Sequence, residues 1–225
     1  MTLGGATRRP DLRTILEALD ALDWSNTSRV ADGCASALRE IALRPELILG
    51  RMGEVAGDAR VRSLCESYDI LDKVVLWDSL TGFRLRLHVF RSGYFDRPHN
   101  HRWSYTSRIL VGGYRHVLYG TPERSFSLDD LRPSLVREEA QGSCYTLDHR
   151  MVHAIEAAAS PTISLVLRGP SVVSEFTVAD RVTGETWTQR GAAEETEAER
   201  AEKHMTDARF SAVQDLLRHE LGDSR

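Results

Sequence analysis

Residues 93–101 read Gly-Tyr-Phe-Asp-Arg-Pro-His-Asn-His, and this stretch decides the fold. It places His99 and His101 one residue apart. Side chains alternate between the two faces of a strand, so on a strand both imidazoles point to the same side. A third histidine, His153, stands at the start of another predicted strand. Three neutral imidazoles on one side of a divalent metal leave the opposite positions open, as a catalytic site requires.

The apolar residues on both sides of this stretch alternate with a period of two. Between residues 72 and 190 the sequence predicts a series of short strands, separated by turns rich in Gly, Pro, Asp and Ser. No helical period interrupts them, so an antiparallel sandwich or barrel is predicted. The predicted strands cover residues 74–77, 83–90, 103–111, 114–119, 143–147, 152–157, 163–167, 172–178 and 186–188.

The two ends of the chain have a helical period instead. Apolar residues follow helical spacing from about residue 10 to 67, and an acidic segment after residue 190, interpreted as a solvated charged helix or linker, leads into an amphipathic helix. We divide the chain into an N-terminal helical segment (1–70), a β-barrel (71–190) and a C-terminal acidic linker and helix (191–225). The final apolar stripe could cover the barrel or pair with a second chain, which makes a homodimer one expectation. It consists of Phe210, Val213, Leu217 and Leu221.

Composition limits the partners and the compartment. The net charge of −4, from 29 Lys+Arg and 33 Asp+Glu, predicts neither a nucleic-acid partner nor a polybasic membrane surface. No apolar run approaches the roughly 20 residues of a membrane span, and residues 1–10 lack the apolar region of a secretory signal. The three cysteines form neither a CxxC pair nor a disulfide framework, so a reducing, cytoplasmic location is expected.

The histidine stretch and its glycine spacing resemble the two motifs of the cupin superfamily. The first motif, G-x5-H-x-H-x3/4-E-x6-G, is matched by Gly93, His99, His101 and Gly112. The second, G-x5-P-x-G-x2-H-x3-N, fits in register without a gap from Gly142 to His153, although its Pro, Gly and Asn are Asp148, Arg150 and Ala157 here. The likeness extends over about residues 72–190. It implies a mainly β fold, a cupin-type antiparallel β-barrel or jelly roll, with the helical ends outside it.

The departures from these motifs define the ligand set. The glutamate ligand of the family would fall at Tyr105 or Thr106, and neither is a carboxylate. The set that the resemblance carries over is therefore His99, His101 and His153, without an acid. Within the superfamily this pattern is similar to the three-His non-heme iron dioxygenases. It implies Fe(II), or another divalent first-row metal, with O2 as co-substrate and a substrate that chelates the metal.

Physical reasoning on the site agrees with this resemblance. Three neutral ligands leave the full charge of the metal uncompensated, which favours an anionic chelating substrate. A histidine at position 101 disfavours a 2-oxoglutarate-dependent enzyme, which would have a carboxylate there. The Ser-x-His-x-Tyr pattern of thiol dioxygenases would fall at 164–168, where its His and Tyr are absent, so cysteine oxidation is put in doubt.

We therefore predict a metal-dependent enzyme, a small-molecule dioxygenase of the three-His type. Two alternatives stay open. One is a non-oxidative isomerase or cyclase of the same fold that uses its metal as a Lewis acid. The other is a non-catalytic barrel that binds a small molecule.

Further side chains are candidates for substrate binding. Arg86 and His88 lie on the basic face of a strand, which either faces solvent or lines the cavity and holds a substrate carboxylate. Trp103 is predicted to form a cavity wall, and Arg168 to anchor an anion. Tyr105 is the candidate catalytic residue, because its hydroxyl could donate a hydrogen bond to a bound ligand or oxygen species; otherwise it is a core residue.

Two more histidines lie close to the motifs. His116 is either a residue that supports a metal ligand or a histidine of the core or surface. His149 falls in a predicted turn before His153, and we expect its side chain to be exposed.

Overall fold

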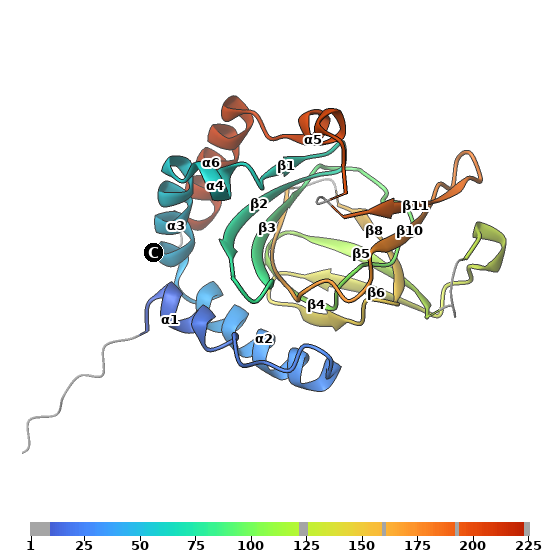
Figure 1. Cartoon of the computed structure of the whole chain (residues 1–225), viewed down its shortest axis with the longest axis horizontal. Helices are drawn as coiled ribbons and strands as arrows, with labels where there is room; N and C mark the ends of the chain where they lie inside the picture. The colour runs from blue at the N-terminus through green and yellow to red at the C-terminus, as the bar shows by residue number, and fades with distance from the viewer. Residues whose placement is uncertain (1–9, 122–125, 159–160, 192–193, 223–225) are drawn as a thin grey trace, which may run out of the picture.

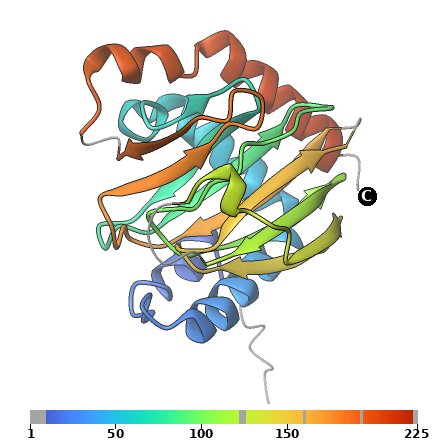
Figure 2. The same cartoon turned by 90° about the vertical axis from the view of Figure 1, so that its right-hand side faces the viewer.

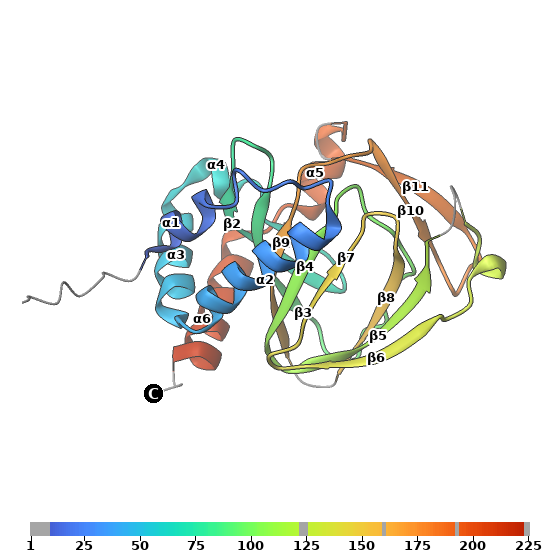
Figure 3. The same cartoon turned by 90° about the horizontal axis from the view of Figure 1, so that it is seen from below.

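The computed structural model describes residues 10–121, 126–158, 161–191 and 194–222. Residues 1–9, on which the expectation about a secretory signal rests, lie outside these ranges. Two antiparallel sheets face each other, and helices cover the outer side of the larger sheet (Figures 1 and 3). The predicted fold class, a mainly β protein with helical ends, is confirmed.

Six strands form the larger sheet. Their order is β1 (Glu66–Ser67), β2 (Leu71–Asp78), β3 (Arg84–Phe90), β9 (Thr162–Arg168), β4 (Tyr105–Val111) and β7 (Cys144–Leu147). The facing sheet has the order β6 (Leu135–Ala140), β5 (Gly113–Gly120) and β8 (Val152–Ala157). A hairpin of β10 (Glu175–Ala179) and β11 (Thr186–Arg190) flanks one end of the two sheets (Figure 2). Every strand pair is antiparallel.

Each predicted strand has a counterpart within a few residues. Strands β1 and β6 are the two that the sequence pattern missed. Strand β6 is rich in charged residues and has an exposed outer edge, so it lacks the apolar alternation that marks the other strands. Strand β1 has only two residues, which is too short for any period.

The HxH stretch differs from its prediction as a regular strand. His99 forms isolated bridges to His153 and Val178, and His101 lies outside the strands. The amide of His99 donates to the carbonyl of His153 at 2.9 Å, and the amide of His153 donates back at 2.9 Å. The amide of His101 donates to the carbonyl of His149 at 3.0 Å. The stretch is therefore extended and held at single points, and alternation still places both imidazoles on one side.

The helices begin at polar caps. Asp11 accepts a hydrogen bond from the Thr14 amide at the start of α1 (Leu12–Glu17), and Asn26 caps α2 (Thr27–Ala42) in the same way. Pro45 occupies the first turn of α3 (Pro45–Gly57), where its missing N–H costs nothing. The remaining helices are α4 (Ala59–Arg62), α5 (Glu197–Lys203), α6 (Asp207–Gly222) and the 3-10 turn η1 (Leu128–Asp130).

Alternation along β3 and β9 separates the core from the cavity. Leu87 and Leu165 are register partners and belong to a fully buried cluster that joins the sheet to the helices. Their sequence neighbours Arg86 and Val166 point to the other side, into the space between the sheets. The outer face of this sheet therefore carries the main hydrophobic core, and its inner face is free to carry polar groups.

The apolar stripe of α6 is buried within the chain. All four of its residues belong to the core that α3 and the larger sheet share, and Figure 1 shows α6 beside α3 and α4. Arg209 donates to the buried carboxylate of Asp72 on β2 at 2.8 Å. Two roles were possible for this stripe from the sequence, covering the barrel or pairing with a second chain. In the structure the stripe packs into the core on the chain's own sheet. Within the described part of the chain, no helix has the length and apolar composition of a membrane span.

Replacing Leu217 by alanine tests this packing. Leu217 is fully buried, so Leu217→Ala should lower the free energy of unfolding by about 2–5 kcal/mol through lost burial and the cavity that remains. Arg218 is exposed and forms a surface ion pair with Asp215, so Arg218→Ala should cost less than about 0.5 kcal/mol. Urea denaturation measures both variants. Equal losses would contradict the assigned packing of α6.

Candidate metal centre and cavity

A cavity of about 220 Å³ lies between the two sheets and the β10–β11 hairpin. Its wall unites residues that are far apart in the sequence, because the inner faces of both sheets and the HxH stretch contribute to it. The sequence-predicted site residues all line it: Arg86, His88, His99, His101, Trp103, Tyr105, His153 and Arg168. The structure thus brings every one of them together.

The three histidines of the motifs form one cluster. Each offers a ring nitrogen, and these nitrogens all lie within 4.8 Å of one another. The ring centroid of His99 lies 4.7 Å from that of His101 and 4.6 Å from that of His153. Among the described residues, no carboxylate or thiol joins them within this distance. This donor set suits a divalent first-row metal, because imidazole binds these ions. Three imidazoles also leave the remaining coordination positions of such a metal open.

The proton on His99 has a fixed place. Its Nδ1 lies 2.7 Å from the carbonyl oxygen of Arg97, which can only accept a hydrogen bond. Nδ1 must therefore carry the proton, and Nε2 keeps its lone pair. The carboxylate of Asp96 lies 3.4 Å from the same Nδ1 and favours this tautomer further.

A second chain of contacts orients His153. Its Nδ1 lies 2.9 Å from Nε2 of His116, and Nδ1 of His116 faces a carboxylate oxygen of Glu139 at 3.6 Å. Contact with His116 lowers the pKa of Glu139, and Arg137 adds to the effect, so this buried carboxylate is ionised despite its burial. A carboxylate draws the His116 proton to Nδ1, so Nε2 of His116 accepts the proton of His153. Nε2 of His153 is left bare and faces Nε2 of His101 at 2.9 Å.

Burial keeps His101 and His153 uncharged. Desolvation lowers the pKa of His101 and of His153 well below the usual value of 6.5, and the neighbouring His99 adds to the effect in both. Neutral imidazoles are the form that binds metals. These two histidines are therefore in their ligating state at neutral pH.

Tyr105 carries a hydroxyl group next to this cluster. Its oxygen lies 3.3 Å from Nε2 of His153, and the side chain is buried. Burial raises the pKa of Tyr105 well above 10, with further contributions from Tyr145 and Tyr114. The phenol therefore keeps its proton at neutral pH and can donate it to a group that binds beside His153.

The basic face of β3 lines the cavity, which decides between the two orientations that the sequence left open. Arg86 lies over the ring of Trp103 with its guanidinium carbon 5.6 Å from the centroid, and Arg168 does the same at 4.9 Å. The ring of Trp103 lies 5.9 Å from that of His101. Trp103 is thus close to the histidine cluster and to these two cations, and Arg102 lies over the same ring at 5.3 Å.

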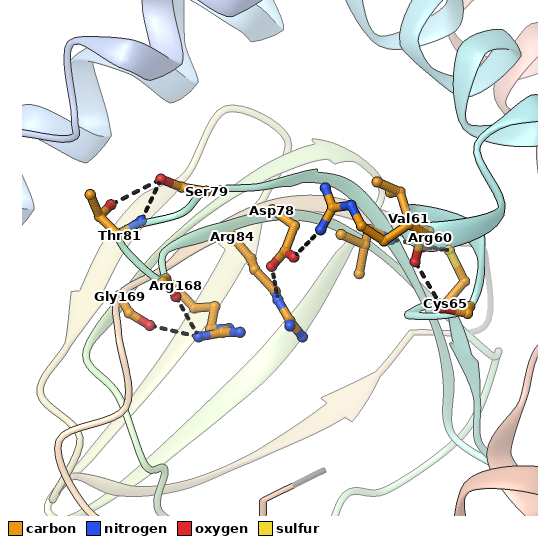
Figure 4. A network of polar contacts seen from close by, with 12 residues as sticks. Arg60, Val61, Cys65, Asp78, Ser79, Thr81, Arg84, Arg168 and Gly169 are labelled. Carbon is orange, nitrogen blue, oxygen red and sulfur yellow. Dashed lines mark hydrogen bonds and ion pairs between the residues drawn. The ribbon is translucent and has the colours of Figure 1, made fainter. Parts of the chain in front are cut away.

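Arg168 is fixed from behind by backbone carbonyls. Its Nη1 donates to Gly82 at 3.0 Å and to Gly169 at 2.9 Å, and Figure 4 shows the second of these contacts. The neighbouring Arg84 turns instead to Asp78 at 2.5 Å. Burial, followed by the charge of Arg86, lowers the pKa of Arg168. Arg86 and Arg168 therefore line the cavity, whereas the charge of Arg84 is neutralised by Asp78.

Three site residues escaped the sequence analysis. Lys73 precedes the residues predicted as strand, although β2 starts at Leu71 and turns this side chain into the cavity. Glu139 lies on β6, which carried no strand signal. Asp96 stands within the quoted motif, and its spacing of three residues from His99 is the one signal that could have found it. His149 lies in the predicted turn and does not line the cavity, but its side chain is partly buried beside Asp148 rather than exposed as expected.

Comparisons with known proteins give distant structural neighbours. No protein-family model and no curated protein matches the sequence. The solved structures include the DMSP lyase DddQ from Ruegeria pomeroyi, at 16% identity over 48% of this chain and 51% of that one, with a TM-score of 0.38. An RmlC-like cupin from Shewanella frigidimarina matches at 14% identity over 48% of this chain and 84% of that one, with a TM-score of 0.38.

A third neighbour is a sugar phosphate isomerase of the cupin superfamily from Silicibacter pomeroyi. It matches at 16% identity over 58% of this chain and 83% of that one, with a TM-score of 0.36. This chain spans about half the length of the DMSP lyases that it matches. All of these TM-scores are below 0.5, so the similarities indicate no activity for this chain.

The contact between His116 and His153 leads to a prediction about metal affinity. His116→Phe removes the acceptor of the His153 proton, so the affinity for a divalent metal should fall about 10–100-fold. His116→Gln keeps an acceptor oxygen and should restore most of the affinity. Competition with a chromophoric chelator measures the affinity, and ¹⁵N NMR of the imidazoles reports the tautomer of His153.

His149→Phe is the matched control, because it also replaces a histidine but lies outside the cavity wall. Its metal affinity should equal that of the wild type. An unchanged affinity in His116→Phe, with the same His153 tautomer, would exclude the orienting role of His116.

Proposed function

We propose that this protein is a metal-dependent small-molecule oxygenase of the three-His type that acts on an anionic, chelating substrate. The observation that supports it most is the cluster of three imidazoles on the wall of one cavity, with no carboxylate among its donors in the described residues. His99, His101 and His153 are the residues that would hold the ion. We propose Fe(II), with another divalent first-row metal as the alternative and O2 as co-substrate.

The metal, when bound, supplies Lewis acidity and a place where substrate and dioxygen meet. The chain supplies the environment. Its three ligands bring no negative charge, so a substrate anion is needed to balance the site. Arg86 and Arg168 line the same cavity beside Trp103 and attract such an anion into it.

Tyr105 is the residue that we propose to be catalytic. It is the cavity hydroxyl within hydrogen-bond range of a cluster nitrogen, at 3.3 Å from His153. Its raised pKa keeps the proton on the phenol, so Tyr105 can hold a hydrogen bond to a substrate oxygen beside the cluster. The hydroxyl orients the substrate and compensates charge that develops on that oxygen.

The same tyrosine favours a second candidate function. A proton-carrying group beside a Lewis-acid site is what a non-oxidative isomerase or cyclase requires. Turnover in the absence of O2 would separate this candidate from the oxygenase. A barrel that only binds its ligand would show no turnover under either condition.

Oxygen consumption tests the proposed function. Protein loaded anaerobically with Fe(II) should consume O2 when 2-oxo, 2-hydroxy or hydroxylated aromatic acids are added, because these anions chelate a metal. The double variant His99→Ala, His101→Ala should lose metal and at least about 99% of the rate, since two of its three ligands are gone. Loaded protein that consumes no O2 with any chelating acid would refute the oxygenase.

Removing the Tyr105 hydroxyl tests its role separately. Tyr105→Phe should lower kcat about 10²-fold or more while the metal content stays unchanged, because the ring remains and the proton donor is lost. Tyr119→Phe is the control, since that hydroxyl contacts Arg181 outside the cavity wall. A rate within twofold of wild type in Tyr105→Phe would exclude Tyr105 from the chemistry.

A further inference from the structure

Two charged side chains on the cavity wall have no counter-ion in direct contact. Lys73 and Arg86 make no hydrogen bond and no ion pair within 4 Å among the described residues. Arg86 is 7% exposed, and its Nε is buried without a partner. The remaining contacts are with aromatic rings, Tyr68 under Lys73 at 4.3 Å and Trp103 under Arg86. These faces attract a cation but neutralise no charge.

Sheet register places further polar groups beside them. Lys73 on β2 is the register partner of His88 on β3, and His88 is the partner of Ser164 on β9. Arg86 is two residues from His88 and so shares its face. Nε2 of His88 and the hydroxyl of Ser164 are also buried without a hydrogen-bond partner. Four unpartnered polar groups from three adjacent strands therefore meet on one part of the cavity wall.

Other buried arginines of this chain are paired. Arg62 donates to the carbonyl of Met205 at 2.7 Å and to Asp207 at 3.1 Å. The acid with the largest influence on Lys73 and on Arg86 is Glu66, the register partner of Lys73 on β1. It forms its ion pair within 4 Å with Lys203, at 3.4 Å, so it compensates the two cavity cations only from a greater distance. An uncompensated buried charge is costly to the fold, so it persists where a ligand supplies the missing partner.

We infer that Lys73, Arg86, His88 and Ser164 form an oxyanion subsite, separate from the histidine cluster, that binds a second acidic group of the ligand. An ammonium, a guanidinium fork, an imidazole and a hydroxyl together fit a carboxylate or a phosphate. The ring of Trp103 is close to both Arg86 and His101, so the subsite and the cluster lie within reach of one ligand whose two acidic ends are separated by a short linker. The cavity of about 220 Å³ limits it to a small molecule. The substrate class is thus a small dianion.

This inference deepens the proposed function, because it takes the histidine cluster as the site of the first acidic group. The subsite itself needs no metal, so it can be tested on metal-free protein. Binding there is then independent of whether the loaded protein consumes O2.

Isothermal titration of metal-free protein with inorganic phosphate and with acetate tests the subsite. Wild-type protein should bind at least one of the two, and whichever binds identifies the acidic group. Lys73→Met, Arg86→Met and the double variant should weaken this binding at least tenfold. Arg115→Met is the control, because it removes an exposed arginine outside the cavity, and its affinity should be unchanged.

Thermal unfolding separates binding from a structural role. In buffer without multivalent anions, Arg86→Met should have a Tm no lower than wild type, because an unpaired buried charge is replaced by an apolar chain of similar length. A lowered Tm, or unchanged anion affinity in both single variants and the double variant, would overturn the subsite.

Binding to protein loaded with Ni(II) tests whether the ligand is a dianion. This measurement needs no O2. Succinate and glutarate should bind at least tenfold more tightly than butyrate and valerate, and this preference should disappear in Arg86→Met. Equal affinities of diacids and monoacids in the wild type would overturn the substrate class. Absent O2 uptake together with a preserved diacid preference would refute the oxygenase and leave the subsite standing.

Discussion

The reciprocal backbone hydrogen bonds between His99 and His153 are the constraint on which the site depends. Both are 2.9 Å long, and they join a stretch outside the strands to strand β8 of the smaller sheet. Two side chains whose backbones pair in this way start from neighbouring positions on one face. His101 follows at the next position of the same face. The cluster is therefore set by main-chain pairing, which is less sensitive to side-chain replacement than a network of side chains would be.

The two faces of the larger sheet have different roles: the outer face packs in the main hydrophobic core, and the inner face lines the cavity. Leucines and isoleucines on its outer face pack with the helices in one buried cluster, so the inner face need not supply the core. This division explains how the protein accommodates buried cations and unpartnered hydroxyls on β3 and β9 without losing its fold. Their cost is offset mainly by the core on the other side of the same strands, and a second buried apolar cluster, which includes Val166, lies on the cavity side.

Local patterns in the sequence predicted the strands and the convergence of the three histidines, because alternation and spacing are properties of neighbouring residues. The residues that orient the metal-binding histidines and complete the cavity wall were harder to predict. Glu139 lies on a charged edge strand that resembles a loop in sequence, and its link to His153 passes through His116 on a third strand. Lys73 faces the cavity because of the pairing of β2 with β3. Such contacts depend on sheet order, which no local period encodes.

The position of α6 has a consequence for biosynthesis. Its apolar stripe packs beside α3, which is translated more than a hundred residues earlier, and both cover the same sheet. The outer face of that sheet thus stays incompletely covered until α6 has been synthesised and has left the ribosome. A nascent chain carries exposed leucines throughout this interval, which is the situation in which chaperones bind. The core on this face is therefore completed only when α6 becomes available for packing.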